Sequence, residues 1–404
     1  MNLINWTLEL IRIILNFISS IGFILIIIFI IIIIYTLLYF LRDRKNIKIY
    51  LNFKDPDFLP LNALNILPLV NIIIPAWKEG TIFKNLLVSI KNLTYPAIKV
   101  IVNAGGNDET IEIANSFKKY DNFIILYQKR GADRPSLGKI RALNECLQFI
   151  SEGIVYFIDA DSYLSDEILL RMIYPITNLD ENIVLGGVRP LKNQESKDLV
   201  KYLLFDRFYS PKTKFSRHVS NPPITGQSLC LKYEVIKSIG RFTENKNYAT
   251  DKSMGIDIYS KGFNSYLLYD YRHRIYVDYS STISELIHQK TIWIENALFF
   301  SFKNKKLNIV KFLFSFLISL YIISFPFLLF IHSAFFLIGV LMLLIIYFLK
   351  IKKLLFFKRV VNKEFYEKYG IIFFLKLIFY IFIEVIIILR IPFHFLVFLI
   401  KSKK

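Results

Sequence analysis

Residues 154–161 read Ile-Val-Tyr-Phe-Ile-Asp-Ala-Asp, and this stretch decides the fold class. Five residues of strand type lead directly into two carboxylates. A short apolar run bounded in this way indicates a buried strand. Three similar runs precede it, and each is followed by a segment of helical type. The predicted elements before it are strands over Val70–Pro75, Lys99–Asn103 and Phe123–Tyr127, and helices over Thr81–Lys91, Glu109–Lys119 and Lys139–Ile150.

Four alternations of strand and helix predict an α/β fold with a mostly parallel sheet and helices on both faces. Such a sheet binds ligands at the carboxyl ends of its strands, so the residues that follow each strand are the candidates. Asp159 and Asp161 stand there, close enough to share a hard cation. Because oxygen ligands favour Mg²⁺ or Mn²⁺, we expect a divalent cation and a nucleotide diphosphate at this edge.

The composition predicts a membrane protein. Hydrophobic residues make up 54% of the chain, and the formal net charge is +19. The basic residues cluster beside apolar runs, which is typical of membrane proteins whose charged loops stay on one side and does not fit a nucleic-acid partner. The chain has only Cys146 and Cys230, which argues against a disulfide scaffold and excludes a zinc site built of thiolates. The apolar content excludes intrinsic disorder.

The first apolar segment is a candidate anchor. No charge occurs over the 29 residues from Ile13 to Leu41, enough at about 1.5 Å per residue to cross a hydrocarbon core of about 30 Å. Basic residues follow it over Arg42–Lys48 and only Arg12 precedes it, so the positive-inside rule places the next domain in the cytosol. We therefore expect an anchor over 1–41, a basic linker over 42–69 and a cytosolic domain over 70–300.

Residues 301–404 form a predicted carboxy-terminal membrane region. The 38 uncharged residues over 312–349 are too long for one span and fit a hairpin of two spans with a turn near His332-Ser333. A basic segment follows over 350–370. The last apolar region, 371–400, contains Pro392 and is either one kinked span or a span followed by an interfacial segment.

Glu384 lies within this last apolar region. Charges inside a membrane are costly and often functional. Pairing with Lys376 or Arg390, or snorkelling to the interface, is the preferred interpretation.

Motifs over residues 70–293 resemble, in order, those of the family-2 glycosyltransferases, which have the GT-A fold. Ile74–Glu79 (IPAWKE) resembles the family's P-x-x-N-E turn, and Val102–Thr110 (VNAGGNDET) resembles its V-D-D-G-S-x-D-x-T segment. The resemblance implies that the nucleotide of a nucleotide-sugar donor contacts four residues of these two motifs. They are Pro75, Ala76, Glu79 and Asn103. Asn103 and Ala104 replace the two aspartates usual in the family.

Two further motifs concern the donor diphosphate. Residues 134–144 (RPSLGKIRALN) resemble the family's R-x-x-x-x-G-K-x-x-A-L-N, which implies that Lys139 binds the donor. A lysine there can pair with phosphate oxygens as a point charge. In the family's metal position, Asp161 resembles the metal ligand, and Asp159 resembles a contact to the ribose or to the metal site.

The resemblance also implies an acceptor side. Residues 225–229 (TGQSL) resemble its T-G segment, where Gly226 would lie against the acceptor sugar. Residues 249–255 (ATDKSMG) stand where the family has T-E-D-x-D-L, and Asp251 is in the position of the general base. Inverting transfer requires one such carboxylate to take the acceptor's proton.

The last motif is His288–Trp293 (HQKTIW), which resembles the family's Q-x-x-R-W loop with Ile292 in place of the arginine. It implies that Gln289 and Trp293 bind the acceptor. An aromatic ring suits the face of a sugar. Trp293 is equally consistent with an anchor at the membrane interface.

The resulting hypothesis is a membrane-bound inverting glycosyltransferase of the cell membrane with several spans. It would take a sugar from a cytosolic nucleotide-sugar donor and pass it to a lipid-linked or membrane-proximal acceptor beside membrane lipid. One alternative is a processive polysaccharide synthase, which the missing arginine at Ile292 counts against. The other is an inactive, glycosyltransferase-like membrane scaffold, suggested by the missing carboxylates at Asn103, Ala104, Thr250 and Ser253.

Overall fold

The structure is a computed structural model of the 404-residue chain. The residues that it describes are isolated positions before 61, then 61–64, 66–128, 135–195, 197–208, 217–220, 224, 226–244, 250–271, 274–303, 308–330, 333–360 and 371–402. Most of the predicted anchor and linker, the predicted turn residue His332 and the motif residues Arg134, Thr225 and Ala249 lie outside the described residues. The chain divides into two compact units, one with residues 53–208 and 215–308, the other including residues 309–404.

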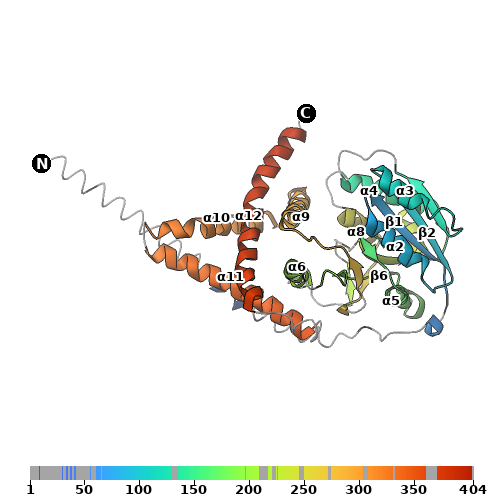
Figure 1. Ribbon diagram of the computed structural model, residues 1–404, viewed down its shortest axis with the longest axis horizontal. Helices are drawn as coiled ribbons and strands as arrows, with labels where there is room; N and C mark the ends of the chain where they lie inside the picture. The colour runs from blue at the N-terminus through green and yellow to red at the C-terminus, as the bar shows by residue number, and fades with distance from the viewer. Residues whose placement is uncertain are drawn as a thin grey trace. The chain divides into compact units, whose positions relative to one another are not determined.

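The first unit is built on an eight-stranded sheet with the strand order β3-β2-β1-β4-β9-β6-β10-β8 (Figure 1). β1 lies between β2 and β4 and is parallel to both, and β3 continues the parallel set. β9 runs antiparallel to β4 and β6, and β8 runs antiparallel to β10. In the order of the sheet, the strands are β3 Phe123–Tyr127, β2 Ile98–Gly105, β1 Val70–Trp77, β4 Ile154–Ile158, β9 Ser228–Lys232, β6 Ile183–Leu185, β10 Ser265–Leu267 and β8 His218–Val219.

A second sheet has three strands, and the first of them in the chain follows β4. It has the order β5-β11-β7, with β5 Ser162–Tyr163, β11 Ile275–Val277 and β7 Val188–Pro190. β11 pairs antiparallel with β5 and parallel with β7. Because β5 begins directly after Asp161, the small sheet extends from the edge where the sequence predicts the site.

Helices cover both faces of the large sheet. The helices of this unit are α2 Thr81–Lys91, α3 Asp108–Asn115, α4 Pro135–Leu147, α5 Asp166–Asn178, α6 Asp198–Phe208, α7 Tyr233–Ile239, α8 Thr250–Ser260 and α9 Ile283–Lys303, with a short 3₁₀ turn, η1, over Leu61–Ala63.

Alternate residues of each strand face opposite sides of a sheet, which decides what each helix covers. Ile73, Ile101 and Phe157 pack with α4, α7 and α8 in one apolar core. On the other face, the hydroxyls of Tyr156 and Ser228 lie 3.3 Å apart, and the Ser228 hydroxyl contacts α5. The predicted α/β class is therefore confirmed, but the sheet between the two layers of helices is mixed, because β9 and β8 run antiparallel to their neighbours. The predicted helix 109–119 ends four residues early, at Asn115.

The second unit contains long apolar helices: α10 Asn308–Leu328, α11 Ser333–Val360 and α12 Ile371–Ser402. α10 ends and α11 begins on either side of the predicted turn. Among the described residues, two helical segments are long and apolar enough to cross a membrane, Phe335–Leu355 and Ile372–Phe393, and Phe312–Phe327 is a shorter apolar helix.

Glu384 of α12 forms an ion pair in this unit. Its carboxylate accepts a hydrogen bond from Lys350 Nζ of α11 at 2.8 Å. The preferred expectation for Glu384 was pairing with Lys376 or Arg390 of α12 or snorkelling, and the partner found here lies on the neighbouring helix α11. α12 continues as a helix through Pro392.

Candidate active site

Asp159 and Lys139 form the centre of the site. Asp159 follows β4 in the alternation of Val155 and Phe157, which face α4. Lys139 lies in the first turns of α4, and its Nζ donates to Asp159 Oδ1 at 2.5 Å. Burial lowers the pKa of Lys139, but Asp159, Asp251 and Asp161 offset it and raise that pKa to about 12. Lys139 is therefore a permanent cation among three carboxylates.

Further carboxylates surround Asp161. Asp278 follows β11, and its N–H donates to the carbonyl oxygen of Asp161 at 2.9 Å. Burial and, next, the charge of Asp159 raise the pKa of Asp161 to about 7; Lys139 lowers it, and Glu79 and Asp278 also raise it. Burial, Asp159 and Asp278 also raise the pKa of Glu79. Four acidic side chains thus come from the ends of β1, β4 and β11.

The geometry of Asp161 suits a cation. Its Oδ1 is buried and has no hydrogen-bond partner among the described residues. A buried carboxylate oxygen without a partner is costly unless it meets a positive charge. Within the described part of the chain, no three His, Cys, Asp or Glu side chains lie close enough to hold a metal alone. Mg²⁺ is commonly bound by one or two carboxylates together with substrate phosphates, and Asp159 and Asp161 fit that arrangement.

Asp251 meets Gly226 at this site. Asp251 lies in the first turn of α8, and its carboxylate accepts a hydrogen bond from the backbone of Gly226. A Cβ built on Gly226 would lie 2.4 Å from Asp251 Oδ1, so a side chain at position 226 would displace the carboxylate. Burial raises the pKa of Asp251, Lys139 lowers it and Asp159 raises it. The structure therefore brings Asp251, Lys139 and Asp159 within electrostatic reach of one another, as the proposed roles require.

The loop after β1 is fixed to α3. The N–H of Glu79 donates to Thr110 Oγ1 at 2.6 Å, and the Thr110 hydroxyl donates to the Glu79 carbonyl oxygen at 2.7 Å. This holds Glu79 near Asp159 and Asp161. Pro75 and Ala76 lie within β1, and Ala76 is fully buried. Their contacts to a donor remain predictions.

The side chain of Asn103 contacts α4. It is fully buried in β2, and its Nδ2 donates to Glu145 Oε2 at 2.7 Å and to the Ala142 carbonyl oxygen at 3.3 Å. The side chain thus fastens β2 to α4. A role of Asn103 in donor binding remains a prediction.

Gln289 and Trp293 lie four residues apart on α9, and therefore on one side of that helix. Gln289 Oε1 accepts a hydrogen bond from the Ser280 hydroxyl at 3.0 Å, which ties it to the segment just after Asp278. The Trp293 side chain is 38% exposed. Acceptor binding by either residue remains a prediction.

The motifs did not identify Asp278. The sequence does contain a feature that could have identified it: Ile-Tyr-Val-Asp over 275–278 repeats the pattern of an apolar strand that ends in a carboxylate. Gln194 Nε2 donates to Asp278 Oδ1, and the N–H of Tyr279 donates to Gln194 Oε1 at 3.0 Å. Gln194 therefore fixes the direction of the Asp278 carboxylate.

The sequence of this chain is similar to those of known glycosyltransferases. The model of "Glycosyl transferase family 2" matches residues 71–240. Glycosyltransferase AglE of Haloferax volcanii is 26% identical over 180 residues, covering 44% of this chain and 56% of that protein. Beta-monoglucosyldiacylglycerol synthase of Trichormus variabilis is 30% identical over 125 residues, covering 30% of this chain and 26% of that protein. The chain thus spans little more than half the length of the first relative and about a quarter of the second.

Among solved structures, the mannosyltransferase PcManGT from Pyrobaculum calidifontis, in complex with GDP-Man and Mn²⁺, superposes with a TM-score of 0.44 at 17% identity, covering 67% of this chain and 71% of that chain. Residues 71–240, which contain Lys139, Asp159, Asp161 and Gly226, match the family-2 model, and together with the named relatives this match supports a glycosyltransferase of family 2.

Proposed function

We propose that the protein is a membrane-bound inverting glycosyltransferase that takes its sugar from a nucleotide-sugar donor and depends on a divalent cation. One observation carries the proposal. Lys139, bonded to Asp159, also lies within reach of the carboxylates of Asp161 and Asp251. A cationic group for a diphosphate, two carboxylates for a metal and one carboxylate for a proton thereby occur together, from α4, the end of β4 and α8.

Asp251 is the general base in this proposal. It takes the proton of an acceptor hydroxyl, whose oxygen forms a bond to the anomeric carbon of the donor sugar. The bond between that carbon and the diphosphate oxygen breaks, and the configuration inverts because the attack comes from the opposite face. Burial raises the pKa of Asp251 and makes its carboxylate a stronger proton acceptor.

Lys139, Asp159 and Asp161 act on the leaving group. The ammonium of Lys139 is positioned to pair with the diphosphate. Asp159 and Asp161 would hold Mg²⁺ or Mn²⁺, which when bound neutralises charge on the leaving diphosphate. Glu79 and Asp278 add negative charge around this position and favour its occupation by a cation.

The acceptor is proposed to be lipid-linked or membrane-proximal, with Gly226, Gln289 and Trp293 beside it and Pro75, Ala76, Glu79 and Asn103 on the nucleotide side. Two helices long and apolar enough to cross a membrane follow the family domain. The relative from Trichormus variabilis carries a diacylglycerol in its name. Both observations support a catalytic domain over 70–300 beside the cell membrane, and the basic residues over Arg42–Lys48 support the cytosolic side.

The test is a donor screen. Full-length protein in lipid nanodiscs, with Mn²⁺ and a lipid extract, is incubated with a panel of radiolabelled nucleotide sugars. We expect label in a lipid-extractable product, and loss of that product with EDTA, in Asp161→Asn and in Asp251→Asn. Asp121→Asn, an exposed carboxylate before β3, is the matched control and should be fully active. A product of high molecular weight would instead indicate a processive synthase, and no transfer from any donor would refute the proposal.

A further inference from the structure

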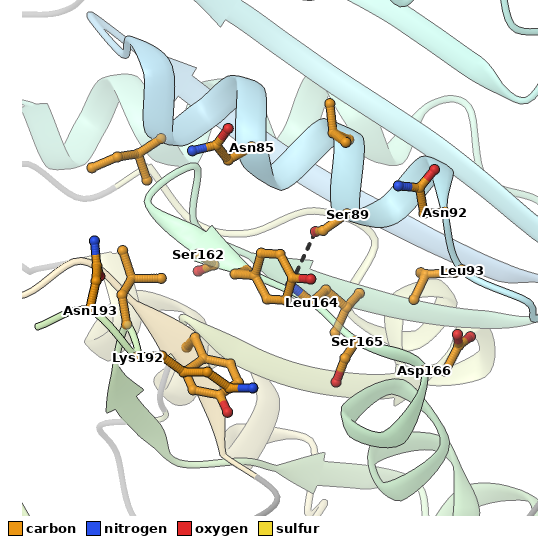
Figure 2. Close-up of a pocket in the computed structure, with 15 residues that line it drawn as sticks. Asn85, Ser89, Asn92, Leu93, Ser162, Leu164, Ser165, Asp166, Lys192 and Asn193 are labelled. Atoms are coloured by element: carbon orange, nitrogen blue, oxygen red, sulfur yellow. Dashed lines mark hydrogen bonds between the residues drawn. The ribbon is translucent and has the colours of Figure 1, made fainter. Parts of the chain in front are cut away.

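A cavity of about 570 Å³ lies between α2, the small sheet and the turn after β7. This volume is within the range of about 300–1,000 Å³ typical of small-molecule sites. Figure 2 shows Asn85 on α2, Asn92 just after α2 and Asn193 on the segment that faces them around the same cavity. None of the residues described above as the active site lines it.

The walls of the cavity are fixed by hydrogen bonds. Along α2, the lining residues are 82, 85, 88 and 89, which share one side of the helix, and Asn92 follows just after its end. Ser89 Oγ accepts from the Leu164 N–H at 3.3 Å and donates to the Leu86 carbonyl oxygen at 2.7 Å, so α2 holds the segment after β5. On the facing side, a turn is closed by the N–H of Gln194, which donates to the Leu191 carbonyl oxygen at 2.8 Å.

Two tyrosines supply aromatic surface. Tyr163 and Tyr276 are paired across β5 and β11, with ring centroids 6.1 Å apart and planes at 75°. Tyr276 is buried beneath the Arg189 guanidinium, which lies 3.7 Å from its ring centroid. Tyr163 is 42% exposed. The Tyr163 ring is therefore available to a ligand, and the Tyr276 ring packs against it.

The polar groups of the cavity are mostly uncharged. The side-chain amides of Asn85, Asn92 and Asn193 make no hydrogen bond within the described part of the chain. The one lining carboxylate, Asp166, accepts from the Thr94 N–H at 2.7 Å, and the one lining cation is Lys192. Amides on opposite walls offer donors and acceptors to vicinal hydroxyls, and a tyrosine ring packs against the C–H face of a sugar.

Other ligand classes fit this lining less well. A nucleotide diphosphate carries several negative charges, and Lys192 alone is a weak counterpart. An alkyl chain filling the cavity would bury the three amides without partners, which is costly.

Residues that line the cavity are close neighbours, along the chain, of residues of the candidate active site. Ser162 and Tyr163 follow Asp161 directly, and Tyr276 lies two residues before Asp278. Gln194 ends the turn that carries Asn193 and also binds the Asp278 carboxylate. We propose that this cavity binds neutral sugar residues of the acceptor glycan, remote from the hydroxyl that attacks the donor. The inference rests on the proposed glycosyl transfer.

The experiment measures binding separately from transfer. Full-length protein in nanodiscs is tested against immobilised neutral trisaccharides of glucose, mannose and N-acetylglucosamine. We expect at least one to bind, and Asn85→Ala and Tyr163→Ala each to weaken it by about tenfold, the loss expected for one or two contacts. Two controls should bind as wild type: Lys84→Ala, on the same helix outside the lining, and Phe149→Ala, an exposed aromatic after α4.

The outcomes separate this inference from the proposed function. Failure of every trisaccharide to bind, or equal binding by pocket and control variants, overturns the inference even if transfer occurs. Binding of farnesyl phosphate in place of any trisaccharide, lost in the same variants, assigns the cavity to a lipid chain and also overturns it. Trisaccharide binding that depends on Asn85 and Tyr163, persists in Asp251→Asn and occurs without turnover of any donor supports the pocket and refutes the proposed transfer.

Discussion

The contact between Gly226 and Asp251 predicts the effect of adding one methyl group. In Gly226→Ala, the new Cβ would lie 2.4 Å from Asp251 Oδ1, and ordinary contact begins at 3.4 Å, so the carboxylate must move by about 1 Å. A misplacement of about 1 Å in a reacting group can lower the rate about 100-fold. Loss of a general base altogether costs about 10²- to 10⁴-fold. We therefore expect Gly226→Ala to lower kcat about 100-fold.

The assay is a double-mutant cycle on sugar transfer. Because Gly226→Ala acts through Asp251, it should lower kcat strongly in the wild type and very little in Asp251→Asn. The KM for the donor should stay the same, since the diphosphate pairs with Lys139 and the cation. Gly262→Ala is the control: its φ is +83° and no atom lies within 4 Å of the added Cβ, so it should lower stability without lowering kcat.

Two results would refute this reasoning. Equal reductions of kcat by Gly226→Ala in both backgrounds would mean that position 226 acts independently of Asp251. A wild-type kcat in Gly226→Ala would mean that the carboxylate is not the positioned base.

Four further predictions concern charge. Asp161→Asn should abolish the rise in melting temperature caused by Mn²⁺, and an unchanged rise would contradict the metal role. Burial and Asp159 raise the pKa of Asp161 from its ordinary value of 3.8 to about 7. Without a cation, the contribution of Asp161 to stability is therefore fully present below pH 3.8 and is lost as the pH rises through about 7. Mn²⁺ should raise the melting temperature more at about pH 8 than at about pH 6, as measured by thermal unfolding. Lys139→Gln should lower kcat by about 10²- to 10³-fold, the cost of one donor to a developing charge, with an intact melting transition; activity near wild type would exclude its role. Lys350→Met should lower the free energy of unfolding by about 3 kcal/mol because it removes the ammonium group that pairs with the Glu384 carboxylate, and the double change with Glu384→Leu should recover most of it in detergent-solubilised protein.

Much of the fold follows from local pattern. The run over 154–158 is apolar, short and closed by Asp159, and β4 has those bounds. The first three strands and α2 likewise coincide with apolar runs of the predicted type. β5, β7 and β11 were not predicted, because each has only two or three residues.

Only part of the candidate site could be predicted from the sequence. Lys139, Asp159 and Asp161 lie near one another because the two aspartates follow β4 and Lys139 lies on α4, the helix that precedes β4 in the chain. Asp278 was missed because it lies 117 positions after Asp161 and meets it only through the pairing of β11 with β5. The hydrogen bonds from the Asn103 amide to α4 could not be predicted either, because they join residues about 40 positions apart.

The sequence by itself determined the α/β class, the strand edge with its two aspartates and the apolar helices, since each depends on the character of consecutive residues. Only the tertiary structure decided that Gly226 lies against Asp251, that Lys350 rather than Lys376 or Arg390 pairs with Glu384, and that a cavity lined by amides adjoins the small sheet. These features join segments far apart in the chain or on different helices. Their geometry is set by how the layers pack, which no local pattern of residues encodes.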